Sequence, residues 1–170
     1  MMTDDKISSH TMAVLVDNEA GVLARVIGLF SGRGYNIDSL AVAEVDGDGH
    51  MSRITIVTCG TPMVVEQIKA QLGRLVSVHR VVDLTVEAES VERELALIKV
   101  SGNGDNRVEA LRLSEAFRAR VVDATPASFI FELTGRKEKV DAFIDLMRPI
   151  GLQEVSRTGV VAISRGPDPL

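Results

Sequence analysis

The feature that most constrains the fold is an order of strands and helices that the sequence indicates twice within 170 residues. Residues 10–86 alternate short apolar runs with helical spacings in the order strand, helix, strand, strand, helix, strand. Residues 91–166 indicate the same order, with an additional short strand at 160–163. One hairpin and two crossovers arrange such strands in an antiparallel sheet with both helices on one face. The expected fold class is therefore α+β, with two ferredoxin-like (βαββαβ) domains in tandem.

The individual elements follow from periodicity and from the residues that interrupt it. Val22, Val26 and Phe30 recur at helical spacing, and glycines at 32 and 34 end that pattern. The other elements expected in the first half are strands at 11–16, 37–45, 51–59 and 78–84 and a helix beginning near Pro62. Those expected in the second half are strands at 94–100, 120–124, 129–134 and 152–156 and helices over 108–117 and 140–147. The acidic stretch 87–94 is the expected joint, which gives domains at 10–86 and 91–166.

Composition excludes several classes of partner. The formal net charge is −5, and no basic patch of the kind that binds nucleic acid is present. No apolar stretch approaches the roughly 18 residues of a membrane span, and the N-terminus lacks the apolar core of a signal peptide. We therefore expect no nucleic acid, no membrane and a cytoplasmic location. The single cysteine, Cys59, cannot form an intramolecular disulfide, and its apolar run predicts a small buried hydrophobic residue.

The sequence offers no catalytic or metal-binding constellation. The three histidines, His10, His50 and His79, lie far apart, whereas metal sites show closer spacing. The glycines at 32 and 34 follow a helix and those at 102 and 104 lack a third glycine, so neither pair fits a dinucleotide-binding loop. The chain is therefore expected to be no enzyme on its own, with no catalytic residue, no metal and no cofactor of its own.

The loop at 17–21 is the one candidate ligand site. It joins the first strand directly to a helix, whose first N–H groups carry partial positive charge and suit a small carboxylate. Gly21 allows a ligand to approach the backbone, and the side-chain carbonyl of Asn18 can accept a hydrogen bond from an ammonium group. The alternative interpretation is a simple turn in which Asp17 or Asn18 only caps the helix.

One long motif favours the interpretation of this loop as a ligand site. Residues 15–40 read LVDNEAGVLARVIGLFSGRGYNIDSL, and this segment resembles the ACT domain of the regulatory small subunit of acetolactate synthase (acetohydroxyacid synthase). The similarity continues through Ser52 and Arg53 and through segments at 91–100, 122–126 and 157–166. It therefore covers nearly the whole chain, from about residue 10 to residue 166.

The resemblance implies a function and partners. Small subunits of this family bind a separate large catalytic subunit, which uses thiamine diphosphate, magnesium and FAD to condense pyruvate with a second 2-oxoacid. They raise its activity and confer feedback inhibition, usually by valine, in the synthesis of valine, leucine and isoleucine. Their ACT domains pair as a homodimer. By this resemblance the chain is a non-catalytic regulatory subunit.

The resemblance also implies an effector site at the interface of the ACT pair. Asn18 and Gly21 would line it from one chain, and Asn36 and Ile37 from the other. The full set of effector-binding residues expected on this basis is Asn18, Ala20, Gly21, Val22, Leu23, Asn36 and Ile37. Two alternatives stay open: a free-standing ACT-type amino-acid sensor that acts on another protein, and a small enzyme of ferredoxin-like fold.

Overall fold

The structure, a computed structural model, describes residues 6–45 and 47–170, and these form two compact units. One unit comprises the described residues up to Val91 together with Val161–Leu170, and the other is Glu92–Val160. The expected second domain extended to residue 166, whereas the last ten residues of the chain group with the first unit.

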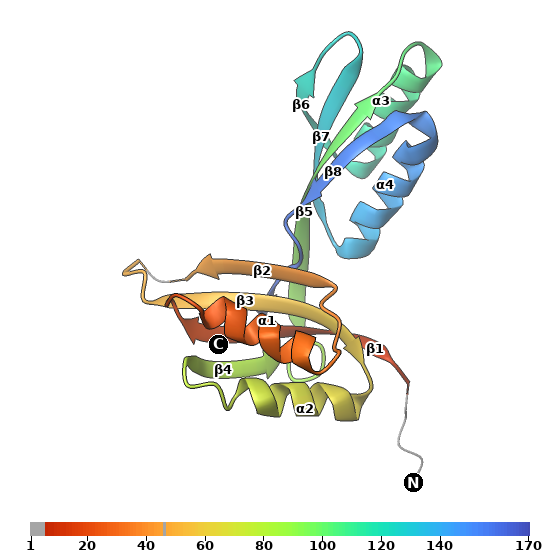
Figure 1. Cartoon of the computed structure of the whole chain (residues 1–170). Coiled ribbons are helices and arrows are strands. Elements are labelled where there is room, and N and C mark those ends of the chain that lie inside the picture. The colour runs from red at the N-terminus through yellow and green to blue at the C-terminus, as the bar shows by residue number, and fades with distance from the viewer. Residues whose placement is uncertain (1–5, 46) are drawn as a thin grey trace. The chain divides into compact units, whose positions relative to one another are not determined.

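The first unit is built on one four-stranded antiparallel sheet whose strands lie in the order β2-β3-β1-β4. Figure 1 shows its two helices on the same face of this sheet. The elements are β1 (Ser8–Asp17), α1 (Val22–Gly32), β2 (Ser39–Glu44), β3 (Met51–Gly60), α2 (Pro62–Leu72) and β4 (Val78–Asp83). This arrangement confirms the expected ferredoxin-like order.

The core of the first unit follows from alternation along its central strands. Met12 and Val14 of β1 lie opposite Ile56 and Ile54 of β3, and all four side chains are fully buried beneath the helices. Both helices bury one residue in each turn against them. These residues are Val22, Val26 and Phe30 of α1 and Val65, Ile68 and Leu72 of α2.

The opposite face of this sheet is covered in part by the C-terminal segment. Its strand β9 (Val161–Ser164) places Ala162 in a small buried cluster with Ala13 and Val82. The guanidinium Nη2 of Arg53 donates a hydrogen bond to the carbonyl of Ala162 at 2.6 Å. The additional strand expected at 160–163 is therefore present, and it packs on the first sheet.

The second unit repeats the topology with strands in the order β6-β7-β5-β8, and β9 pairs with β5 outside this path. Its elements are β5 (Ser90–Ser101), α3 (Asp105–Phe117), β6 (Arg120–Ala124), β7 (Ser128–Gly135), α4 (Lys137–Gly151) and β8 (Leu152–Arg157). Because β5 begins at Ser90, the acidic joint expected at 87–94 lies mostly within a strand. The boundary between the two units falls inside β5, after Val91.

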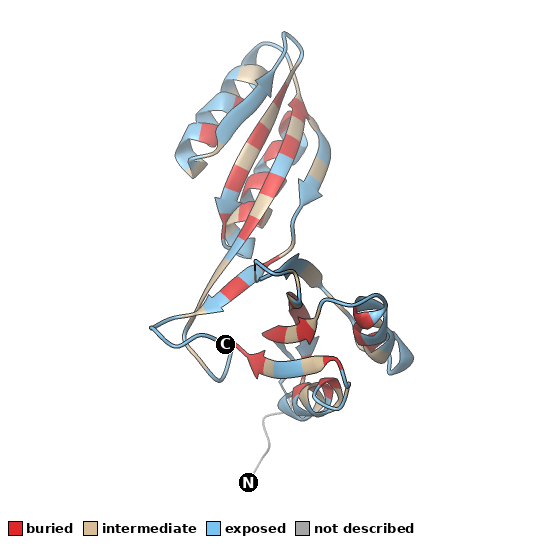
Figure 2. Ribbon diagram, turned by 90° about the vertical axis from the view of Figure 1, so that its left-hand side faces the viewer, coloured by how far each residue is buried: buried red, intermediate tan, exposed pale blue. Residues whose placement is uncertain are grey.

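A compact aromatic and aliphatic core fills the second unit. Ile98 of β5 and Phe131 of β7 lie fully buried under Phe143 and Met147 of α4. The rings of Phe131 and Phe143 meet edge to face, with centroids 5.9 Å apart. The buried bands that cross the strands of each unit in Figure 2 mark these two separate cores.

Cys59 differs from its expectation, because its side chain is exposed. Strand β3 is buried at every position from Ile54 to Thr58 and again at Gly60, and only Cys59 between them is exposed. The thiol of Cys59 donates to a carboxylate oxygen of Asp38 at 3.1 Å. The apolar run predicted the strand correctly but not the exposure of this one side chain.

Candidate functional site

The loop between β1 and α1 has the geometry of an open helix start. Gly21 precedes α1 with φ 87° and ψ −7°, a left-handed conformation that glycine adopts without strain. No side chain caps the helix. The carboxylate of Asp17 instead contacts His79 Nε2 at 2.6 Å. The side-chain cap that the alternative interpretation expected from Asp17 or Asn18 is therefore not formed.

The side chain of Asn18 is held in one orientation. Its amide nitrogen donates to Glu44 Oε1 and to the carbonyl of Gly49, both at 2.9 Å. Because these bonds use both N–H groups of the amide, the side-chain carbonyl is left to accept from a ligand. The nearby Glu44 carboxylate adds negative charge, so this position favours an ammonium group.

The first turn of α1 presents backbone more than side chains. The N–H of Val22 reaches the carbonyl of Glu19 at 3.4 Å, and its side chain is only 4% exposed, within the core. Ala20, Gly21 and Leu23 are exposed. By helix geometry the next N–H groups have no partner within α1, so they are available to an anion. Of the expected site residues in this turn, Val22 can therefore contribute only backbone atoms.

Asn36 and Ile37 lie in the segment that follows α1. Thr58 Oγ1 donates to the carbonyl of Asn36 at 2.5 Å, and the Asn36 amide donates to a carboxylate oxygen of Asp38. The Asn36 side chain is exposed, whereas Ile37 is half-buried against the core. These contacts hold the segment that contains Asn36 and Ile37 beside the C-terminal end of β3, next to Thr58.

The structure does not bring the two groups of expected site residues together within one chain. Asn18 follows Asp17, which pairs with Met51 at the start of β3, while Asn36 is bound to Thr58 near its end. Seven residues of extended strand separate these points, or about 23 Å. A pocket that uses both groups must therefore take them from two chains.

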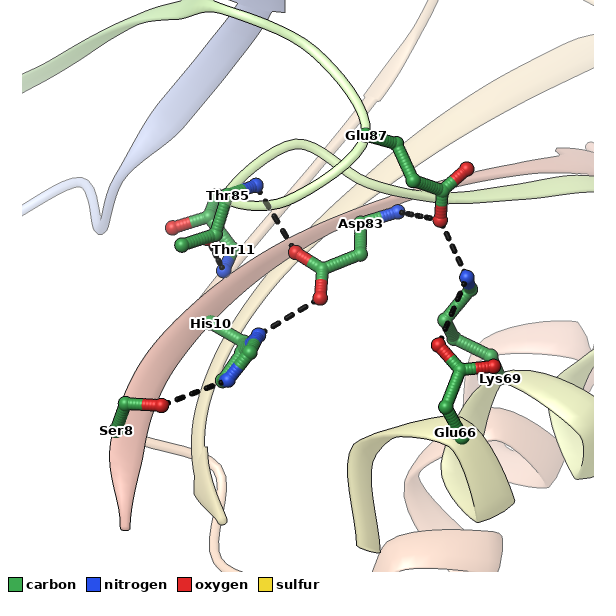
Figure 3. A network of polar contacts seen from close by, with 8 residues as sticks. All are labelled: Ser8, His10, Thr11, Glu66, Lys69, Asp83, Thr85 and Glu87. Carbon is green, nitrogen blue, oxygen red and sulfur yellow. Dashed lines mark hydrogen bonds and ion pairs between the residues drawn. The ribbon is translucent and has the colours of Figure 1, made fainter. Parts of the chain in front are cut away.

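A second polar network joins β1, β4 and α2 at the other end of the sheet (Figure 3). His10 Nδ1 contacts Asp83 Oδ2 at 2.7 Å, and its Nε2 contacts the hydroxyl of Ser8 at 2.9 Å. His10 and Asp83 are only 5% and 2% exposed. Lys69 pairs with Glu87, whose carboxylate also accepts from the backbone N–H of Asp83. His10 and Asp83 are therefore buried within the sheet, whereas the Lys69–Glu87 pair that connects the network to α2 is partly exposed.

Within residues 6–45 and 47–170, no cluster of three or more His, Cys, Asp or Glu side chains could hold a metal ion. The same residues include no helix that is long and apolar enough to span a membrane.

The fold and the loop together define the class of the chain, an ACT-domain protein with a second ferredoxin-like unit. Residues 12–80 match the family described as the AHAS small subunit-like ACT domain, and residues 93–166 match the family described as the small subunit of acetolactate synthase. The chain therefore belongs to the family of acetolactate synthase small subunits.

Full-length relatives agree with this assignment. A probable acetolactate synthase small subunit of Archaeoglobus fulgidus is 52% identical, over 92% of this chain and 97% of the relative. The isozyme 3 small subunit of Salmonella typhimurium is 48% identical, over 91% and 94%. The crystal structure of the small subunit from Thermotoga maritima is 38% identical, covers 95% of this chain and 99% of that one, and superposes with a TM-score of 0.85.

Sequence reasoning did not find the partners of the loop residues. Glu44 and Gly49 orient Asn18, and His79 holds Asp17, yet each lies between 26 and 62 positions away along the chain. The only available signal was the break between the strands expected at 37–45 and 51–59, which predicts a turn between them. Nothing in its residue types indicated a hydrogen bond to Asn18.

Proposed function

We propose that the chain is a regulatory subunit that binds the large catalytic subunit of acetolactate synthase, raises its activity and confers inhibition by valine or another branched-chain amino acid. The observation that carries this proposal is similarity over more than nine-tenths of the chain to acetolactate synthase small subunits. Thiamine diphosphate, magnesium and FAD would belong to the large subunit, and the chain would not turn over substrate alone.

The proposed effector site lies between two copies of the first unit. Strand β2 is at the edge of the sheet and pairs with β3 on one side, so a second copy of the chain could add a strand along its other side. If two copies pair antiparallel through β2, Glu44 of one lies near Ser39 of the other. Asn18 contacts Glu44, and Asn36 lies just before Ser39. This pairing brings the loop of one chain close to the Asn36 segment of its partner.

The chemistry of this interface suits a small apolar amino acid. Backbone N–H groups at the start of α1 would hold its carboxylate, and the Asn18 carbonyl would accept from its ammonium group, with Glu44 adding charge. Leu23 and Ile37 would surround a branched side chain. Because one methylene is worth about 1–3 kcal/mol, discrimination among valine, leucine and isoleucine would be modest.

Inhibition requires more than binding. The effector changes the activity of the complex only if it binds two states of that complex with different affinities. A pocket shared by two chains supplies such a difference, because any change in their relative placement alters the pocket. Sensing would then require the dimer.

Reconstitution with the large subunit tests the proposed function. We expect the purified chain to raise the acetolactate synthase activity of the large subunit, and valine to lower the activity of the mixture. No rise on mixing would contradict the proposal. If valine bound the chain without any such rise, the alternative of a free-standing ACT-type sensor with a different partner would be favoured.

Two substitutions test the pocket separately. We expect Gly21→Asp and Asn36→Ala each to increase the valine concentration for half-inhibition by at least about tenfold, while activation of the large subunit persists. Gly21→Asp adds a carboxylate beside the helix start and strains a left-handed position, and Asn36→Ala removes polar contacts worth about 1.5–3 kcal/mol when the partner is charged.

A matched glycine variant controls for general damage. Gly73 ends α2 with an ordinary helical φ of −65°, so Gly73→Ala should leave valine inhibition unchanged. Dose–response curves of the reconstituted enzyme provide the measurement. Unaltered valine sensitivity in both Gly21→Asp and Asn36→Ala would exclude the assigned pocket.

A further inference from the structure

A cavity of about 490 Å³ lies on the face of the first sheet that α1 and α2 leave uncovered. Leu15 of β1 and Met51 and Arg53 of β3 line one side of it, and residues 163, 164 and 166–170 of the C-terminal segment line the other. Its size falls within the range of about 300–1,000 Å³ that is typical of small-molecule sites. The loop at 17–21 contributes nothing to it, so it is separate from the proposed effector site.

Arg53 is the unusual group in this cavity. Burial lowers the pKa of its guanidinium, and no charged group is among the causes of that shift. In the described part of the chain it forms no ion pair, and one hydrogen bond, from Nη2 to the carbonyl of Ala162, anchors it. A guanidinium offers five N–H donors, so the bond to Ala162 leaves donors for a ligand in the cavity that Arg53 lines. A partly buried cation is costly unless an anion accompanies it.

The remaining walls are mostly apolar. Leu15, Val45 and Met51 contribute hydrocarbon from the sheet side, and Ile163 and Leu170 from the C-terminal segment. Arg53 and Asp168 are the two charged side chains in the lining, so the cavity suits a ligand with an apolar body and an anionic group that lies against Arg53. The guanidinium fork matches the two oxygens of a carboxylate.

We propose that this cavity binds a small carboxylate with a branched apolar chain, whose carboxylate pairs with Arg53. The ligand is held on the opposite face of the ACT sheet from the helices and does not require a second chain. Two sources have this chemistry: a plain or 2-oxo acid, and an amino acid whose ammonium group would face Asp168, which also lines the cavity.

The test measures ligand binding by saturation-transfer NMR on the full-length chain in a Gly21→Asp background, which removes the proposed loop site. The probes are 3-methylbutanoate, its neutral analogue 3-methylbutanamide, and L-valine. We expect 3-methylbutanoate to bind and the amide to bind at least about tenfold more weakly, since a hydrogen bond to a charged group is lost. L-valine binding of similar strength would identify an amino acid as the ligand, whereas its absence would identify a simple acid.

Three variants separate the site from general effects. Arg53→Met should weaken 3-methylbutanoate at least about tenfold, whereas Arg80→Met, an exposed arginine of β4 outside the cavity, should not change it. If Arg53→Met fails to fold, Ile163→Glu gives an independent reading. Ile163 is 61% exposed and tolerates the change, and the added carboxylate repels the ligand.

Absence of 3-methylbutanoate binding in the Gly21→Asp background, or binding that Arg53→Met and Ile163→Glu leave intact, would overturn the proposal. Because the readout is binding by this chain alone, the result does not depend on the large subunit. Failure of the proposed regulatory function appears only in the reconstituted activity, so the two outcomes are distinguishable.

Discussion

Gly151→Ala is expected to destabilise the second unit by about 4 kcal/mol or more, which is exceptional for a single substitution. Gly151 is the last residue of α4 and has φ 139°, a conformation that side-chain-bearing residues rarely adopt. A Cβ at this position would lie 1.9 Å from the carbonyl oxygen of Ser101 in β5. The obstacle is backbone, so β8 would have to move away from β5. Since whole domains are stable by about 5–15 kcal/mol, most of the stability would be lost.

Circular dichroism during urea unfolding measures this loss, and hydrogen exchange of β7 and α4 assigns it to the second unit. Gly104→Ala is the matched control. Gly104 also has a positive φ, of 57°, but a Cβ there would meet nothing within 4 Å. Gly104→Ala should therefore lower the free energy of unfolding only by the cost of backbone strain, about 1–3 kcal/mol. Equal losses for the two variants would show that the approach of Ser101 is not as close as the structure describes.

The sequence predicted the fold well where two periodicities coincide with burial. One buried cluster contains both the alternating residues of β1 and the helically spaced residues of α1, so two independent patterns predict the same core. These residues are Met12, Val14 and Val16 of β1 and Val22 and Val26 of α1. The order of elements then leaves few ways to connect the sheet. The local pattern could not say which sheet receives β9, because four residues carry a strand signal but no information about partners.

The candidate site was less accessible to sequence reasoning. A glycine before an amphipathic helix indicates an open helix start, and the structure gives Gly21 the conformation that this requires. The orientation of Asn18 depends on Glu44 and Gly49, which approach only after β2 and β3 have paired. The separation of Asn18 from Asn36 likewise depends on strand register. Such features arise from tertiary contacts, and periodicity does not report them.

The same limit applies to the buried ion pair of the second unit, which supports the other large prediction. Glu94 of β5 and Arg157 of β8 are 63 residues apart, yet Nε and Nη2 of the arginine bind both carboxylate oxygens, at 2.6 and 2.8 Å. The Glu94 side chain is 4% exposed. This hydrogen bond is the main reason that the pKa of Arg157 lies above its usual value. Asp141 of α4 accepts a third bond from the same guanidinium at 2.7 Å.

Arg157→Met should therefore destabilise the second unit by about 3–5 kcal/mol, because it leaves the Glu94 carboxylate buried without a partner. Glu94→Met should cost less, about 1 kcal/mol, since Arg157 is partly exposed and keeps Asp141. The double variant should then be more stable than Arg157→Met alone, with a coupling energy of about 2 kcal/mol or more. Urea unfolding of the four proteins gives this cycle.

The control for this cycle is Arg148→Met on α4, which removes an exposed pair with Asp145 at 3.1 Å and should change stability by less than about 0.5 kcal/mol. The two arginines differ mainly in whether the carboxylate that each leaves behind can be hydrated. Asp145 returns to water when its arginine is removed, whereas Glu94 cannot. If Arg157→Met cost no more than Arg148→Met, water would have to reach Glu94 in the folded state. A double variant no more stable than Arg157→Met would lead to the same conclusion, that burial of the carboxylate does not determine the cost.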